Sequence, residues 1–312
     1  MSLRSLALVL AFLAGLLAVD RSAGLLLGQA FSRLHSEGRV GLANWALEQT
    51  DAELVVFGSS RAVYHVDPEI LQEELGLSAF NAGAPGQSIR YARAMQALLL
   101  ARGSRARVFV LHVDPKNLWG VESARLQRLA PFYGEDPAVD ALLEASSPMA
   151  RLKLQSWAYR YNSLVVPIVA NLLQDRPTPG NGFRVIPADR PQDLERRAPH
   201  TEPGEILPEI SQLYVDFIAV AREKGIRVAF VDSPRWRPDG PSSVRPTDRI
   251  GHRWLGRLAR EHGAAWIVID DSHESRFAGP QLFADISHLN HEGATLYSQL
   301  LAEQLRRVLD AP

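Results

Sequence analysis

The feature that most constrains the fold of this chain is an alternation of short apolar segments with helical patterns. The expected strands cover residues 54–57, 77–80, 107–111, 226–231 and 265–269. Continuous apolar runs are typical of parallel strands, which helices cover on both faces. The expected helices cover residues 68–75, 89–101, 208–224, 248–262 and 292–309, with a linker helix at about 30–50. This alternation predicts an α/β fold, a three-layer α/β/α sandwich around a five-stranded parallel sheet.

The amino-acid composition excludes several classes of function. The 312 residues include no cysteine, which excludes disulfides, thiolate catalysis and zinc–thiolate sites. The net charge of -1 gives no basic field of the kind that nucleic-acid-binding domains carry. We therefore expect no nucleic-acid partner.

The N-terminal segment predicts export. Arg4 precedes an apolar run over residues 6–19, which Asp20 and Arg21 interrupt. No small-x-small cleavage motif follows the run, so we expect residues 1–30 to be an uncleaved membrane anchor. The remaining chain would then lie on the extracytoplasmic (periplasmic) side. The alternatives are a cleaved signal peptide followed by secretion, and a buried N-terminal helix of a soluble protein.

The rest of the chain, residues 31–312, is expected to form one domain with an insertion at about 120–207 after the third strand. The first part of the insertion looks helical and carries aromatic residues, and the second part, 175–205, reads as a long loop rich in Pro, Gly, Arg and Asp. Such an insertion serves as a lid, a substrate platform or a partner surface, or simply as a packing cap.

Two distant segments carry the chemistry. Ser60 follows the first expected strand, and Gly58 permits a sharp turn out of it. Asp285 and His288 lie three residues apart in a turn near the other end of the chain, where a carboxylate can orient an imidazole. A serine hydroxyl becomes a useful nucleophile when a base and oxyanion donors surround it. We therefore expect the fold to join Ser60, His288 and Asp285 as nucleophile, base and orienting acid.

Candidate oxyanion and substrate contacts follow the second and third strands. Gly86 can bring a backbone N–H close to a ligand at the start of a helix, and Asn81 begins the same loop. Asn117 offers a side-chain amide after the third strand. The alternatives are an ordinary loop with Ser88 as a helix N-cap, and Asp114 as a local turn or as a support for the nucleophile loop.

A rival interpretation of the C-terminal segment takes Asp285, His288 and His291 as metal ligands. The chain has no histidine-rich segment that would complete such a site. We therefore expect no metal ion, and we expect His291 to open the last helix.

These segments together resemble the SGNH (GDSL-type) hydrolase superfamily. The matching blocks are Gly58-Ser59-Ser60, the loop from Asn81 to Gly86, and Asp285-x-x-His288, within residues 50–115 and 225–312. The resemblance implies a flavodoxin-like sheet, a triad of Ser60, Asp285 and His288, an oxyanion glycine at Gly86, and ester hydrolysis or acyl transfer without a cofactor.

The chain departs from the SGNH pattern at two places. Ser59 stands where the family has Asp, and Arg61, a further candidate for substrate contact, follows the nucleophile. This variant is similar to a membrane-anchored, exported branch associated with acylation of cell-wall polymers and exopolysaccharides, as in periplasmic alginate O-acetylation proteins. The block normally reading Gly-x-Asn-Asp is Asp114-Pro-Lys-Asn117 here, which leaves the third oxyanion donor open.

The sequence thus predicts an exported serine esterase or O-acyltransferase acting on an acylated glycan or another cell-surface polymer. One alternative is a non-catalytic partner that binds polysaccharide or a multi-pass membrane acyltransferase. Another is a lipid esterase that works at the membrane surface.

Overall fold

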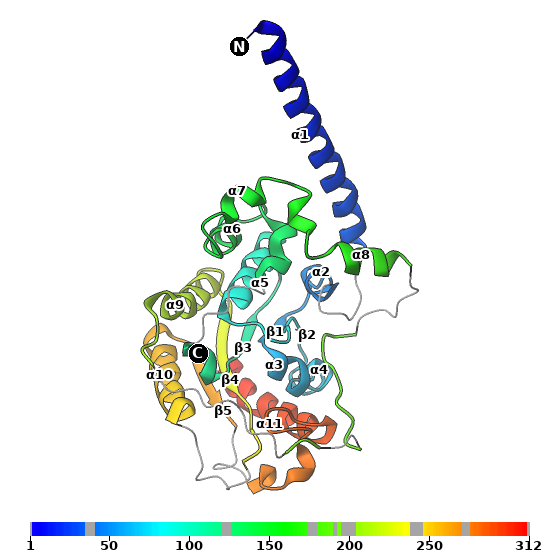
Figure 1. Ribbon diagram of the computed structural model, residues 1–312. Coiled ribbons are helices and arrows are strands. Elements are labelled where there is room, and N and C mark those ends of the chain that lie inside the picture. The colour runs from blue at the N-terminus through cyan, green and yellow to red at the C-terminus, as the bar shows by residue number, and fades with distance from the viewer. Residues whose placement is uncertain are drawn as a thin grey trace. The chain divides into compact units, whose positions relative to one another are not determined.

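The computed structural model describes residues 2–34, 41–119, 126–173, 180–189, 192–194, 204–237, 246–269 and 275–310 (Figure 1). The chain divides into two compact units, of which one contains the sheet (Ala46–Glu122 and Gly180–Pro312) and the other the N-terminal helix (Met1–Trp45 and Ser123–Pro179). We refer to them as the sheet unit and the N-terminal unit.

The sheet unit contains one five-stranded, all-parallel sheet, as the sequence predicts. Its strands are β1 (Leu54–Gly58), β2 (Ala79–Asn81), β3 (Val108–His112), β4 (Arg227–Asp232) and β5 (Ala265–Val268), in the order β2-β1-β3-β4-β5. This is the flavodoxin-like strand order, in which the chain reverses its direction of winding between β1 and β3. Ligands of such sheets bind at this switch point, beyond the carboxyl ends of the strands.

Helices cover both faces of this sheet because its strands are apolar on both sides. Successive side chains of a strand point to opposite faces, so Leu54 and Val56 belong to a core cluster with Leu71 and Tyr297. Phe57, from the other face, makes edge-to-face contacts with Phe109 and Phe217. Two helical layers and the sheet therefore form a three-layer α/β/α sandwich.

The helices predicted for the sheet unit begin and end close to where the sequence places them. They are α4 (Pro68–Leu75), α5 (Ile89–Ala101), α9 (Pro208–Glu223), α10 (Pro246–His262) and α11 (His291–Asp310). Further short helices that were not predicted are α3 (Ser60–His65), η1 (Pro115–Trp119), η4 (Ser275–Phe277) and η5 (Pro280–Leu282), and the division between the two units falls within α2 (Gly41–Glu48). The Asp67 carboxylate caps α4 by accepting from the Glu69 N–H, and Pro68 is the first helical residue. The predicted single linker helix at about 30–50 is wrong, because α2 is a separate short helix.

The N-terminal unit consists of helical segments. They are α1 (Leu3–Ser32), η2 (Leu126–Phe132), α6 (Pro137–Glu144), α7 (Ala150–Leu154), η3 (Tyr159–Tyr161) and α8 (Val165–Leu172). Asp20 does not interrupt α1. Its carboxylate accepts from the N–H groups of Trp157 at 3.0 Å and Ala158 at 3.2 Å. Among the described residues, α1 is the one helix long and apolar enough to cross a membrane, a test that signal sequences also pass.

Residues 180–194 differ from the expected insertion. The structure groups them with the sheet unit, and only Ser123–Pro179 with α1. Backbone hydrogen bonds explain the grouping, since the N–H of Asn81 donates to Asn181 O at 2.9 Å and the N–H of Arg184 to Val63 O at 2.9 Å. The Asp193 N–H donates to Ala284 O at 3.1 Å. A segment that reads as a loop by composition is thus hydrogen-bonded to the sheet unit.

The expected aromatic residues of the insertion pack within the N-terminal unit. Phe31 of α1 makes edge-to-face contacts with Phe132 and Tyr161, with ring centroids 5.7 Å apart in each pair. The guanidinium of Arg160 lies over the Tyr133 ring, 5.0 Å from its centroid. These contacts account for the aromatic residues as core packing of this unit.

Candidate active site

Ser60 is placed by a sharp turn at the end of β1. Gly58 ends the strand with φ of 146°, a conformation that disfavours other residues, and a Cβ there would lie 2.7 Å from His112 O. Ser60 is the first residue of α3 and is half-buried. A residue at this position has a backbone N–H that the helix itself leaves without an acceptor.

His288 and Asp285 lie in the turn between η5 and α11. The Ser60 Oγ and His288 Nε2 atoms are 2.9 Å apart, and His288 Nδ1 is 2.8 Å from Asp285 Oδ2. Because an ionised carboxylate only accepts, Nδ1–H donates to Asp285 and Nε2 is left to accept from the Ser60 hydroxyl. The structure therefore brings together the three residues that the sequence proposes as a triad, in a continuous hydrogen-bond chain.

Asp285 is held in its turn and in its charged form. Its Oδ1 accepts from the N–H groups of Ser287 at 2.7 Å and His288 at 2.9 Å, while Oδ2 faces the imidazole. Burial alone would raise the pKa of Asp285, but the hydrogen bond from His288 and the two backbone donors lower it below 3.8. The side chains of His288 and Asp285 are 23% and 34% exposed, so the chain of groups remains accessible to solvent.

A ring from α3 flanks the imidazole. Tyr64, which is half-buried, meets His288 edge to face with centroids 5.4 Å apart. Tyr64 therefore packs against the imidazole that lies between Ser60 and Asp285. The sequence analysis did not select Tyr64, although its position four residues after Ser60 on a helix was a usable signal.

Arg61 does not face the site. The expectation that it contacts substrate is wrong, since the residue is 1% exposed and its Nη1 donates to Asp232 Oδ1 at 2.6 Å. Its Nη2 donates to the Ser233 carbonyl and, at 2.9 Å, to Ser233 Oγ. Consecutive side chains of a helix are rotated by about 100°, so Ser60 and Arg61 at the start of α3 point to different sides.

Asn81 is also turned inward. It is fully buried, and its Nδ2 donates to Ala62 O at 2.8 Å and to Val66 O at 2.9 Å. Its Oδ1 accepts from the Gly83 N–H at 3.0 Å. Both donors of the amide are used to hold the end of α3, so Asn81 is a structural residue and not the expected oxyanion contact.

Gly86 and Asn117 lie in the loops where the sequence places them. Gly86 occupies the turn between β2 and α5 with φ of 71°, which favours glycine. Asn117 lies in η1, and its backbone N–H donates to Asp114 O at 2.9 Å. Asp114 itself accepts from Arg235 Nη2 at 2.9 Å, which ties this loop to the end of β4. Contact of Gly86 and Asn117 with substrate remains a prediction.

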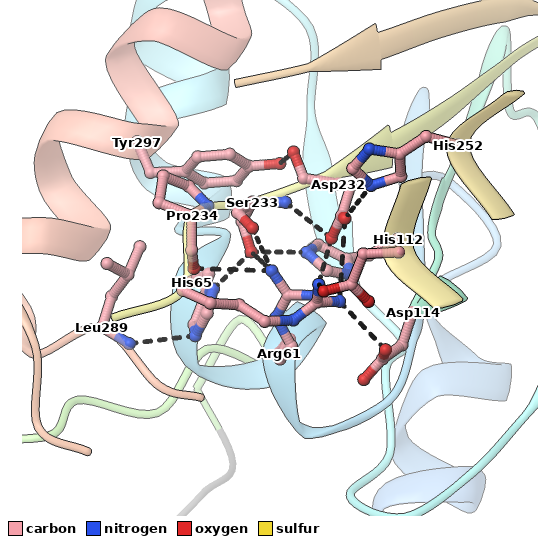
Figure 2. Close-up of polar contacts among 12 residues, drawn as sticks. Arg61, His65, His112, Asp114, Asp232, Ser233, Pro234, His252, Leu289 and Tyr297 are labelled. Carbon is pink, nitrogen blue, oxygen red and sulfur yellow. Dashed lines mark hydrogen bonds and ion pairs between the residues drawn. The ribbon is translucent and has the colours of Figure 1, made fainter. Parts of the chain in front are cut away.

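Figure 2 shows a cluster of buried polar side chains. The cluster adjoins the candidate site, since the rings of His65 and His288 meet edge to face with centroids 6.0 Å apart. We call Arg61, His65, His112, Asp232 and Ser233 the buried cluster; each is less than 5% exposed. Burial would raise the pKa of Asp232, but Arg61 and Arg235 outweigh it and hold that pKa well below 3.8. Burial and the nearby Arg61 charge lower the pKa of His65 well below 6.5 and that of His112 to about 3, so both rings are neutral.

The sequence analysis missed the buried cluster. One signal was available: Arg61 and His65 are four residues apart, which places them on one face of a short helix. In the described parts of the chain, no group of three His, Asp or Glu side chains is arranged to hold a metal ion. His291 begins α11, and its backbone N–H donates to Ile186 O at 2.8 Å.

Comparisons with known proteins place the chain only distantly. No protein-family model and no curated protein sequence matches it. Among solved structures, it is similar to the crystal structure of an acetyl xylan esterase, AlAXEase, with a TM-score of 0.40 and 14% identity over 82% of this chain and 98% of that chain. At this level the likeness adds nothing to the assignment of a function.

Proposed function

We propose that this chain is a serine esterase or O-acyltransferase that uses Ser60, His288 and Asp285. The observation that supports this is the hydrogen-bond chain from Ser60 Oγ through both nitrogen atoms of His288 to Asp285 Oδ2, at 2.9 and 2.8 Å. A nucleophile, a base and an orienting carboxylate in this order are the requirements of acyl transfer through a covalent intermediate.

In the proposed reaction, His288 Nε2 takes the Ser60 hydroxyl proton as Oγ adds to the ester carbonyl carbon. The tetrahedral intermediate then collapses, the C–O bond to the leaving alcohol breaks, and His288 returns the proton to that alcohol. A water molecule or a sugar hydroxyl next attacks the acyl-serine with His288 again as base. The bond between the acyl carbon and Ser60 Oγ then breaks, and His288 returns the proton to Oγ. The Ser60 and Gly86 backbone N–H groups are the proposed oxyanion donors, and Asn117 is the proposed third.

The proposed substrate is an acyl ester of a glycan or another cell-surface polymer. Support comes from the resemblance of the Gly58-Ser59-Ser60-Arg61 segment to the exported SGNH branch and from α1, which has the length and composition of a membrane span. In this proposal α1 anchors the protein, and the sheet unit acts on the extracytoplasmic side. A multi-pass membrane acyltransferase is the proposed source of acyl groups.

An activated-ester assay tests the proposal. Wild-type protein should release p-nitrophenol from p-nitrophenyl acetate, and Ser60→Ala should lower kcat/KM by about 10⁴–10⁶-fold. Ser59→Ala is the matched control, because Ser59 is the neighbouring hydroxyl and makes no contact in the hydrogen-bond chain described above. Equal turnover by wild type and Ser60→Ala would exclude Ser60 as the nucleophile.

The same assay separates the alternatives. An acetyl-specific enzyme loses activity sharply as the acyl chain lengthens, whereas a membrane-surface lipid esterase retains it with long-chain p-nitrophenyl esters. A folded protein that neither hydrolyses these esters nor reacts with a fluorophosphonate would instead be a non-catalytic partner.

A further inference from the structure

The buried cluster connects the two segments that carry the nucleophile and the base. Arg61 directly follows Ser60, and its guanidinium donates to Asp232 and Ser233 at the end of β4. Leu289 directly follows His288, and its backbone N–H donates to His65 Nε2 at 3.0 Å. His65 Nδ1 in turn lies 2.6 Å from Ser233 Oγ. One serine hydroxyl thus links both segments of the site (Figure 2).

The neighbours of the Ser233 hydroxyl determine which atom is the donor in each of its hydrogen bonds. Because His65 Nε2 accepts from Leu289 and the ring is neutral, its proton is on Nδ1 and is donated to Ser233 Oγ. Arg61 Nη2 donates to the same oxygen at 2.9 Å, which occupies its second lone pair. The Ser233 O–H is then left to donate to His112 Nε2 at 2.8 Å. Ser233 makes all three hydrogen bonds that a hydroxyl can make, and only one arrangement of protons satisfies them.

The surrounding charges keep this arrangement in place. Asp232 accepts from Arg61, and its Oδ2 also faces His252 Nε2 at 2.7 Å. Arg235 Nη1 pairs with Asp248 at 3.1 Å and its Nη2 with Asp114 at 2.9 Å. Arg61 is therefore paired with a carboxylate inside the protein, and Arg235 and His252 contact the second oxygen of the same carboxylate.

We propose that His65 is a positioning residue of the active site. It accepts a hydrogen bond from the Leu289 N–H and donates one to Ser233, and so holds the neighbouring His288 in place. This inference rests on the proposed function. His65 touches neither the ester nor Ser60 in the proposed mechanism, and its ring meets that of His288 edge to face with centroids 6.0 Å apart. It therefore acts through the distance between Ser60 Oγ and His288 Nε2. Displacement of a base by about 1 Å from a productive geometry can cost about 10²-fold in rate.

The test compares two substitutions of His65 in the full chain with a fluorophosphonate probe. In His65→Leu, the Leu289 N–H loses its acceptor, and we expect the maximal labelling rate of Ser60 to fall by about 10–100-fold while the half-saturating probe concentration changes little. In His65→Gln, the side-chain oxygen can take the place of Nε2, and we expect labelling to return to within about fivefold of wild type.

Two controls separate positioning from a loss of stability. Leu99→Ala truncates a fully buried residue of α5 and should lower Tm as much as His65→Leu or more, with no change in the maximal labelling rate. Ser233→Ala removes the hydroxyl from the other side of His65 and should slow labelling in the same way, which keeps the test open if His65→Leu does not fold.

The outcomes distinguish a failure of this inference from a failure of the proposed function. Unlabelled wild-type protein would overturn the proposed function and the inference with it. Labelled wild type with unchanged rates in folded His65→Leu and Ser233→Ala would overturn the inference alone. A His65→Gln protein that is as slow as His65→Leu would also overturn it, because restoring the acceptor would then have no effect.

Discussion

Two groups of polar side chains lie at the carboxyl ends of neighbouring strands. They differ in their exposure to solvent and in how many protein partners bind the serine hydroxyl of each group. Ser60, His288 and Asp285 are partly exposed, and their chain of contacts ends at the half-buried hydroxyl of Ser60. The buried cluster is shielded from solvent, and the hydroxyl of Ser233 is saturated by three protein partners. A serine beside a histidine is therefore not enough for reactivity, since Ser233 has two such neighbours and no access to substrate.

The comparison predicts that substitutions in the exposed group change activity without changing stability. The largest effect is expected for His288→Ala, which removes the base and should lower kcat by about 10⁵-fold. The free energy of unfolding, measured by urea denaturation, should change by less than about 1 kcal/mol, because the side chain is partly exposed. Activity within tenfold of wild type would show that the two groups have been assigned the wrong roles.

A smaller loss is expected for Asp285→Asn. The amide keeps the shape of the side chain but can donate to Nδ1, which favours the ring tautomer with its proton on Nε2, facing Ser60. We expect kcat to fall by about 10²–10⁴-fold with KM nearly unchanged. Asp193→Asn, on a segment that pairs with Asp285 through the backbone, is a matched control and should retain activity. An Asp285→Asn enzyme as active as this control would contradict the orienting role.

For the ion pair of the buried cluster, the expected effect is on stability. Arg61→Met removes one partner of a buried ion pair and leaves Asp232 less compensated, which should lower the free energy of unfolding by about 3–5 kcal/mol. Urea denaturation measures this change. Arg105→Met breaks the exposed pair with Asp51 instead and should leave stability unchanged. Equal effects of the two substitutions would remove the distinction between the buried and the exposed polar groups.

The smallest expected effect is a pH dependence of stability that arises from the buried histidines. The folded-state pKa of His112 is lowered to about 3 by burial and then by Arg61, so below about 6.5 the unfolded chain binds a proton that the folded chain does not. The stability from this group is complete above about 6.5 and decreases by about 1.4 kcal/mol per pH unit as the pH falls towards 3. The charged and titratable groups that face His112 among the described residues include Arg61, His65, Asp114, Asp232, Arg235 and Tyr297.

His112→Gln tests this dependence. The glutamine oxygen can accept from Ser233 without titrating, so the slope of unfolding free energy against pH between 4 and 6 should decrease by about one proton, ~1.4 kcal/mol per pH unit. Leu99→Ala, which truncates a buried side chain of α5 that does not titrate, should leave the slope as it is. An unchanged slope in His112→Gln would show that His112 does not remain neutral in the folded protein.

The secondary structure could be predicted closely from local patterns. The predicted bounds of α5 and α4 match the structure, and the strand predicted at 107–111 is β3, shifted by one residue to Val108–His112. Continuous apolar runs and an Asp-Pro cap are local signals and require no knowledge of distant contacts. The grouping of residues 180–189 and 192–194 with the sheet could not be predicted from composition, because backbone hydrogen bonds do not depend on the type of side chain.

The sequence by itself determined that a parallel sheet carries Ser60 at the end of its first strand, because period and apolar content define strands and helices locally. It also selected Asp285 and His288, whose spacing suits a carboxylate and an imidazole in one turn. Only the tertiary structure decided which neighbouring polar residues face solvent. Arg61 is buried because Asp232, 171 positions away, compensates its charge, and a partner that distant is known only once the fold has brought the two residues together.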